Sequence, residues 1–96
     1  MTMLEKQVEA KLGKVVKRHG GRSLKWVSPG EGGVPDRIVL LPGGRIYFVE
    51  LKRPGGKPDK RQLCWADRLR ALGFDCFFLL SAEDVTRFDE FLTNKE

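Results

Sequence analysis

The sequence predicts a small mixed α/β domain whose elements follow the order αβββαβα. Three observations lead to this prediction: a helical apolar pattern near the amino terminus, three strand-like segments between glycine- and proline-rich loops, and two helical patterns around a last apolar segment. The chain has 96 residues, 41% of them hydrophobic, which suffices for one core and leaves no room for a second. We therefore expect a single domain over residues 1–96.

The first helix is indicated by apolar residues that recur at helical spacing. These residues are Leu4, Val8, Leu12, Val15 and Val16. Thr2 is a candidate cap at the start of the helix, and Gly20 and Gly21 end it. Glu5 and Glu9 lie inside or at the edge of the apolar stripe. A carboxylate in such a position is costly unless another group pairs with it, which makes both glutamates candidates for a functional site.

Three strands are expected in the middle of the chain. Residues 23–28 alternate between polar and apolar side chains, and a glycine- and proline-rich loop follows over residues 29–35. Residues 36–41 and 46–52 are rich in β-branched and aromatic residues and are separated by a turn, so they are expected to pair as a hairpin.

The second half of the chain adds a helix, a strand and a helix. Pro58 suits the first turn of the second helix, which is expected to run to about Leu72. The side chains expected to face inward are Gln62, Trp65, Leu69 and Leu72. The nearly continuous apolar run 75–80 is typical of a strand that is covered on both faces. Ser81 and Asp84 indicate the start of the last helix, whose buried side is expected to contain Val85, Phe88 and Leu92.

The charge of the chain is positive and unevenly distributed. Eighteen Lys and Arg against thirteen Asp and Glu give a net charge of +5. Residues 1–30 carry seven positive and two negative charges, whereas residues 61–96 carry five and seven. A basic surface in the amino-terminal part suits a polyanion such as nucleic acid.

Several classes of protein are excluded by composition. Cys64 and Cys76 fit no zinc-binding spacing and His19 is the only histidine, which argues against a zinc site. No apolar run approaches the roughly 20 residues that span a bilayer, and the amino terminus lacks the apolar region of a signal peptide. We expect an intracellular, cytoplasmic protein with no membrane partner, which is not secreted.

The strand over residues 46–52 ends in charged residues. Because side chains alternate along a strand, Ile46, Phe48, Glu50 and Lys52 share one face. Two apolar residues thus lead to a carboxylate and an ammonium group about 7 Å apart along the strand.

The hairpin brings a second carboxylate to this place. A turn centred between Gly43 and Gly44 puts Asp36 opposite Leu51, which points its side chain away from Glu50. A three-residue turn with a bulge instead gives the two carboxylates a shared face. The sequence leaves both registers open, and in either one Asp36 lies close to Glu50.

Two carboxylates and a lysine at a strand end form a candidate site for a divalent cation. Mg²⁺ prefers oxygen ligands, which Asp36, Glu50 and the backbone carbonyl of Leu51 can supply. Lys52 cannot bind a metal while it is protonated, but it can position a water molecule or neutralise a phosphate oxygen. Such a site hydrolyses phosphodiesters, and a basic surface would attract the nucleic acid.

Three pieces of the sequence stand in a characteristic order: Gly33-Val34-Pro35-Asp36, then Phe48-Val49-Glu50-Leu51-Lys52, then Gln62. This order resembles the PD-(D/E)xK nuclease pattern and, more narrowly, the VRR-NUC family of virus-type replication and repair nucleases. The similarity runs from Leu4 to about Asp84. Other matching pieces are Glu5-Lys6-Gln7-Val8-Glu9, Val27-Ser28-Pro29-Gly30, Leu41-Pro42-Gly43-Gly44-Arg45 and Leu69-Arg70-Ala71-Leu72-Gly73-Phe74.

The resemblance implies a restriction-endonuclease-like core, a small mixed sheet flanked by helices, and DNA cleavage that depends on Mg²⁺ or Mn²⁺. It implies that Asp36 and Glu50 bind the metal together with the Leu51 carbonyl and that Lys52 serves the attacking water. It also implies a carboxylate from the first helix, for which Glu5 fits the family pattern and Glu9 is the alternative. Gln62 matches the family's glutamine and is expected to order the site.

The resemblance further implies a biological role. Members that consist of this domain alone resemble Holliday-junction resolvases and act as homodimers, in the cytoplasm of a bacterium or a phage-infected host. The expected function is a structure-selective endonuclease for branched DNA. The alternatives are a flap or nicking nuclease and a non-catalytic basic DNA-binding accessory protein. Candidate contacts to DNA phosphates are Lys6, Lys11, Lys14, Lys57, Lys60 and Arg61.

Overall fold

The computed structural model describes residues 5–53 and 55–96. The elements are α1 (Glu5–Arg18), β1 (Arg22–Lys25), β2 (Arg37–Leu41), β3 (Arg45–Leu51), α2 (Lys60–Ala71), β4 (Asp75–Leu79) and α3 (Ala82–Lys95). This order confirms the predicted αβββαβα arrangement. The expected cap Thr2 and the apolar residue Leu4 lie outside the described residues. In the described part of the chain, no helix is long and apolar enough to cross a membrane.

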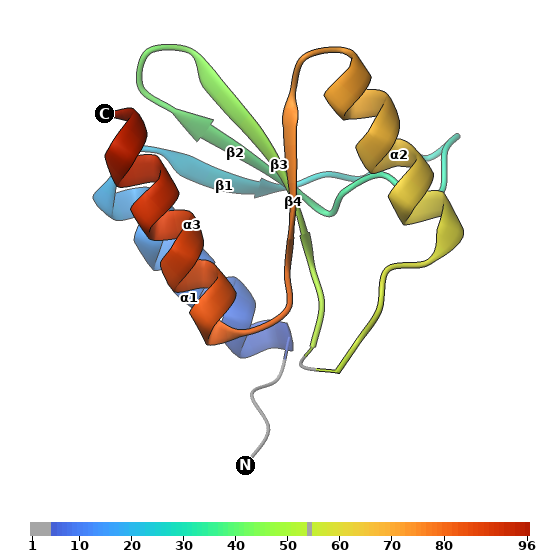
Figure 1. Cartoon of the computed structure of the whole chain (residues 1–96), viewed down its shortest axis with the longest axis horizontal. Helices are drawn as coiled ribbons and strands as arrows, with labels where there is room; N and C mark the ends of the chain where they lie inside the picture. The colour runs from blue at the N-terminus through green and yellow to red at the C-terminus, as the bar shows by residue number, and fades with distance from the viewer. Residues whose placement is uncertain (1–4, 54) are drawn as a thin grey trace.

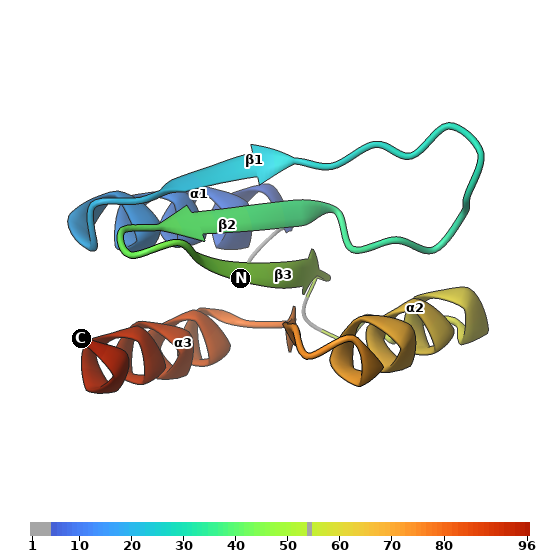
Figure 2. The ribbon, with the colours of Figure 1, turned by 90° about the horizontal axis from the view of Figure 1, so that it is seen from above.

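The four strands form one mixed sheet in the order β1-β2-β3-β4. The first three strands are antiparallel neighbours, and β4 lies parallel to β3. A parallel neighbour requires a crossover connection, which α2 provides. Helices α1 and α3 cover one face of the sheet and α2 covers part of the other (Figure 1; Figure 2).

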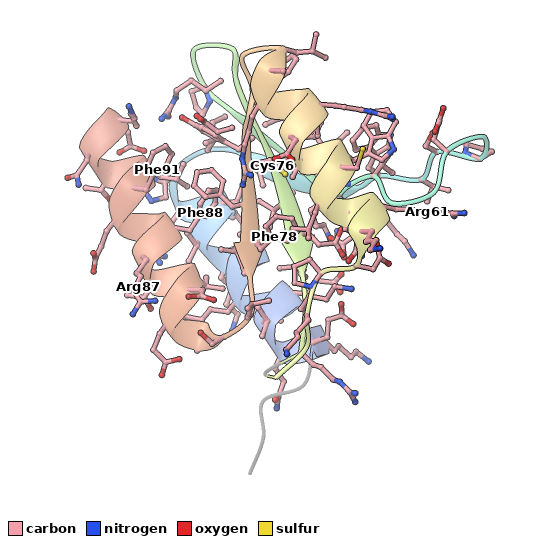
Figure 3. All side chains as sticks on the ribbon, turned by 45° about the vertical axis from the view of Figure 1, so that its right-hand side comes forward. Arg61, Cys76, Phe78, Arg87, Phe88 and Phe91 are labelled. Atoms are coloured by element: carbon pink, nitrogen blue, oxygen red, sulfur yellow. The ribbon has the colours of Figure 1, made fainter. Side chains whose placement is uncertain are left out.

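Each face of the sheet has its own hydrophobic core. Tyr47, Val49 and Leu51 of β3 pack with apolar residues of α1 and α3, among them Leu12 and Phe88. The other core consists of Phe48, Ala66, Leu69 and Cys76, with Trp26, Ile38, Trp65 and Phe78 packed against it. In Figure 3, Cys76 and Phe78 lie on the α2 side of β4, while Phe88 and Phe91 belong to α3. The alternation predicted along β3 therefore separates its Glu50 face from its Leu51 face.

The hairpin adopts the register with a three-residue turn. Leu41 pairs with Arg45 and Arg37 pairs with Val49, so residues 42–44 form the turn. Gly43 and Gly44 both have positive φ, at 84° and 74°, a conformation that other residues rarely adopt. The next position in this register places Asp36 opposite Glu50, and the two carboxylates share a face.

The start of α2 differs from the sequence prediction. Asp59 caps the helix, and its side chain accepts a hydrogen bond from the Gln62 N–H. Pro58 therefore precedes the cap and is not part of the first turn. The prediction that Leu72 faces inward is also wrong, because Leu72 follows the last helical residue and is 72% exposed. Ala66 and Leu69 are the buried residues of this helix.

The first strand is shorter than expected and ends at Lys25. Lys25 pairs with Arg37, and the Trp26 N–H still reaches the carbonyl of Asp36 at 2.9 Å. Beyond this bond the chain enters the glycine- and proline-rich loop. The other strands agree with the expected ranges to within one residue, and Ser81 caps α3 as predicted.

The loop between β1 and β2 is held against α2 by a glycine. Gly33 has a φ of +89°, and a Cβ atom at this position would lie 2.5 Å from the Cβ atom of Arg61. A side chain would therefore push the loop away from the helix. This close packing fixes the segment that leads into Asp36 relative to the first turn of α2.

Polar contacts join α1 to α3 on the other side of the molecule. The Lys11 ammonium donates hydrogen bonds to the Ala82 carbonyl at 3.0 Å and to the Thr86 hydroxyl at 2.9 Å. His19 lies 2.6 Å from the Asp89 carboxylate and also contacts Glu96. The sequence places Lys11 among the expected DNA contacts, but its ammonium is engaged in these hydrogen bonds to α3. Lys11 does not line the site described below.

Candidate active site

The sequence-predicted carboxylates meet at one end of the sheet. Figures 1 and 2 show that the carboxyl end of β3 and the amino end of α1 lie at the same end of the molecule. A hollow of about 310 Å³ opens there. It is lined by Glu5, Lys6, Glu9, Lys25, Asp36, Arg37 and Leu51.

Glu50 lies beside this hollow and is only 5% exposed. Its Oε2 atom accepts a hydrogen bond from the Gln62 side-chain amide at 3.0 Å, and the Lys52 ammonium lies 3.8 Å from the same oxygen. Burial, followed by the charge of Asp36, raises the pKa of Glu50 from its ordinary value to about 7. The first turn of α2 and the end of β3 together hold this carboxylate in place.

Asp36 is held through both its side chain and its backbone. Its Oδ1 atom accepts a hydrogen bond from the Leu51 N–H at 3.3 Å, and its carbonyl accepts one from the Trp26 N–H. The preceding Pro35 is fully buried and anchors the segment. Burial raises the pKa of Asp36 to about 6, and the nearby charge of Glu5 acts in the same direction.

These shifts predict how the stability of the metal-free protein depends on pH. The folded pKa values of Glu50 and Asp36 exceed the unfolded ones, so the folded state holds more protons between about pH 4 and 7, and the free energy of unfolding falls as the pH rises. For Glu50 alone, the shift from 4.5 to about 7 corresponds to about 3 kcal/mol.

The measurement is urea unfolding in EDTA at pH 5 and at pH 8. His19, whose pKa is raised by its hydrogen bonds to Asp89 and Glu96, titrates in the same direction, so the comparison is made with Glu50→Gln. That variant should lose part of the pH dependence while the His19 contribution remains. An identical pH dependence of the free energy of unfolding in the two proteins would show that burial does not raise the pKa of Glu50.

The first helix contributes two glutamates to the hollow, and their surroundings differ. The Glu9 carboxylate forms an ion pair with the Arg37 guanidinium. Glu5 is exposed, has no such partner among the described residues, and its charge raises the pKa of both Asp36 and Glu50. This arrangement favours Glu5 as the helix carboxylate that acts with the pair.

The two glutamates can be separated by matched substitutions. We expect Glu5→Gln to lower the rate of DNA cleavage by about 10–100-fold, the range typical of groups that support a metal site. Glu9→Gln should leave the rate within about threefold, because Glu9 is already neutralised by Arg37. Single-turnover rates at saturating DNA provide the measurement, and the reverse order of effects would assign the role to Glu9.

The donor set fits a hard divalent cation. Asp36 and Glu50 place two carboxylates side by side in partly buried surroundings, where a cation would offset the burial and repulsion that raise their pKa values. Within residues 5–53 and 55–96, no three Asp, Glu, His or Cys side chains gather as a complete metal-binding group. Mg²⁺ does not require one, since it keeps several waters and is usually bound by one or two carboxylates together with substrate phosphates.

The other expected DNA contacts lie in different places. Lys6 lines the hollow, Lys14 is exposed on α1, and Lys57 and Lys60 are exposed around the start of α2. Arg61 lies in the first turn of α2 and packs against the β1–β2 loop, where Figure 3 labels it. Sequence reasoning missed two basic residues that also line the hollow, Lys25 and Arg37. The only signal for them is the register that pairs one with the other.

Comparisons with known proteins agree with this geometry. A protein of Acyrthosiphon pisum secondary endosymbiont phage 1, named "Putative nuclease p44", is 48% identical over 82 residues, which cover 85% of this chain and 87% of that protein. A solved structure described as a "VRR_NUC domain" superposes with a TM-score of 0.85 at 34% identity, over 90% of this chain and 94% of the other. No protein-family model matches the sequence.

The mixed sheet, the carboxylate pair at its end and these relatives define a nuclease of the PD-(D/E)xK class. Within that class, the chain belongs to the VRR-NUC family.

Proposed function

We propose that this protein is a DNA endonuclease that depends on Mg²⁺ or Mn²⁺ and cuts branched DNA, with four-way junctions as its principal substrate. The observation that carries the proposal is the convergence of Asp36, Glu50, Lys52 and Gln62 at one end of the sheet. These side chains come from the start of β2, the end of β3 and the first turn of α2, and together they form one polar site.

The proposed chemistry divides the work among these residues. Asp36, Glu50 and the Leu51 carbonyl would hold the cation, which supplies stabilisation of the negative charge that develops on the phosphate. The Lys52 ammonium positions the attacking water and neutralises a phosphate oxygen. The side-chain amide of Gln62 donates a hydrogen bond to Glu50 and so keeps that carboxylate oriented toward the site. Glu5 adds a further carboxylate from the open side of the hollow.

We also propose that the protein acts as a homodimer, because paired cuts in a four-way junction need two sites related by the symmetry of the junction. Apolar side chains on the sheet face beyond α2 offer a surface for a second copy. They are Leu24, Leu40 and Ile46, with Phe74 beside them. Trp26, Phe77, Phe78 and Phe91 pack against the two cores and are not part of this surface.

Cleavage of synthetic DNA tests the proposal. A four-way junction, a flap and a linear duplex are incubated with the protein and Mg²⁺ or Mn²⁺, and light scattering gives the mass of the protein. We expect paired cuts in the junction and a mass of twice the 10.9 kDa chain. Single cuts by a monomer in flap or nicked DNA would support the flap or nicking alternative. Binding without cleavage of any substrate would support the accessory-protein alternative.

A further inference from the structure

A groove follows the seam between α1 and β1, starting at the candidate active site. Three hollows of about 310, 340 and 470 Å³ lie in a row and share residues with their neighbours. The first and second share Lys6, Glu9 and Arg37, and the second and third share Gly13 and Ser23. Helix α1 and strand β1 run side by side in opposite directions (Figure 1; Figure 2). The three hollows therefore form one continuous path, here called the α1–β1 groove.

The charge along the α1–β1 groove is positive once the path leaves the active site. Lys6 and Lys25 line its first part, and Lys17 and Arg22 line its far part. All four side chains are exposed, and none makes a hydrogen bond or ion pair with another residue in the described ranges.

Among the residues that the structure describes, the third hollow of the groove, farthest from the active site, is lined by no carboxylate. The residues that line the three hollows include three carboxylates, Glu5, Glu9 and Asp36, and all three line the first hollow. Glu9 is paired with Arg37. The far part of the groove therefore presents cations without competing anions, which is complementary to a chain of phosphates.

The length of the groove matches a short stretch of nucleic acid. From Glu5 to Lys17 the helix rises by about 18 Å, at about 1.5 Å per residue. One strand of a duplex advances by about 3.4 Å per nucleotide, so the groove accommodates about five nucleotides.

We propose that the α1–β1 groove binds the sugar-phosphate backbone of the DNA strand that is cut, over about five nucleotides on one side of the cleaved bond. This inference rests on the proposed function, because the groove begins at Asp36 and Glu5. Lys17 and Arg22 contact the phosphates farthest from the cut, and Lys6 and Lys25 contact those beside it.

The first test removes the two far cations. DNA binding is measured in EDTA, where no cleavage occurs, by fluorescence anisotropy of a labelled four-way junction at several salt concentrations. For the double variant Lys17→Gln/Arg22→Gln we expect about tenfold weaker binding and a salt slope reduced by nearly two. The matched control Arg87→Gln/Lys95→Gln removes two cations from α3, outside the groove, and should bind within about twofold of the unchanged protein.

The second test places a charge inside the groove without disturbing the fold. A Cβ atom at Gly13 would meet no atom within 4 Å, so both Gly13→Ala and Gly13→Glu are expected to fold. Gly13→Ala should bind DNA like the unchanged protein. Gly13→Glu should bind it about tenfold more weakly, because its carboxylate meets the phosphates. Thermal unfolding checks that neither variant is less stable than the unchanged protein.

The outcomes separate this inference from the proposed function. If the Lys17/Arg22 and Gly13→Glu variants bind DNA as tightly as the unchanged protein, the groove inference is overturned, even if the protein cleaves DNA. If they bind weakly as expected but the unchanged protein cuts no DNA with Mg²⁺ or Mn²⁺, the proposed function fails, and the groove remains a DNA-binding surface without a cut strand.

Discussion

Replacing Asp36 with asparagine is expected to lower the rate of DNA cleavage by about a thousandfold, which corresponds to about 4 kcal/mol of lost transition-state stabilisation. Asparagine has nearly the same shape and keeps an oxygen that can accept the Leu51 N–H. It lacks the charge that a divalent cation requires from this position. Single-turnover cleavage of a four-way junction at saturating Mg²⁺ gives the rate.

The control for Asp36→Asn is its stability without metal. At pH 8 the variant should be at least as stable as the unchanged protein. It removes a carboxylate whose pKa is raised by burial and by the charge of Glu5, and whose own charge raises the pKa of Glu50. Loss of activity together with retained stability would assign Asp36 to the chemistry. Cleavage at the unchanged rate would remove Asp36 from the metal site.

The second large effect is expected for Lys52→Gln, with a loss of cleavage rate between about 10² and 10³, the range for removing one group that stabilises charge in the transition state. The Lys52 ammonium lies 3.8 Å from Glu50 Oε2, beside the place where the phosphate and the attacking water would meet. Glutamine keeps much of the length of the side chain but supplies neither the positive charge nor a proton.

The readout for Lys52 must separate chemistry from DNA binding. Affinity for the junction in EDTA should change by less than about threefold, because one phosphate contact contributes little to the total. Lys95→Gln, at the far end of α3, removes the same charge and should leave both rate and affinity unchanged. If Lys52→Gln lowers the affinity as much as the rate, Lys52 is a binding residue and the role proposed for it is wrong.

The order of the elements could be predicted from local patterns alone, because helical and strand periodicities are visible in 10 to 15 residues. The placement of Asp36 and Glu50 on one face of the sheet could not be predicted from such patterns. It depends on whether the turn is centred between Gly43 and Gly44 or is formed by residues 42–44, and this one-residue difference decides whether Asp36 and Glu50 share a face. Gly43 and Gly44 both have positive φ angles, and glycine is compatible with either turn.

In the candidate site, too, the helix or strand of a residue could be predicted from local patterns, whereas its contacts could not. Gln62 could be assigned to the helix after the third strand, but its contact with Glu50 depends on the cap at Asp59, which sets where the helix begins. The family resemblance favoured Glu5 over Glu9, but local patterns could not give the physical difference between them, which is the ion pair of Glu9 with Arg37. That pair joins residues from two elements whose relative placement depends on the whole core.

The side chain of Gln62 also couples the first turn of α2 to the position of the Glu50 carboxylate. Its oxygen accepts the Asp59 N–H at 2.9 Å, and its amide nitrogen donates to Glu50 at 3.0 Å, so both ends of one planar group are engaged. We therefore expect fraying of the first turn of α2 to break the hydrogen bond to Glu50 in the same event. Amide hydrogen exchange at Gln62 and Leu63, whose N–H groups bond to Asp59, would therefore report how often the site opens. A bound cation should slow that exchange in proportion to its affinity for the closed form.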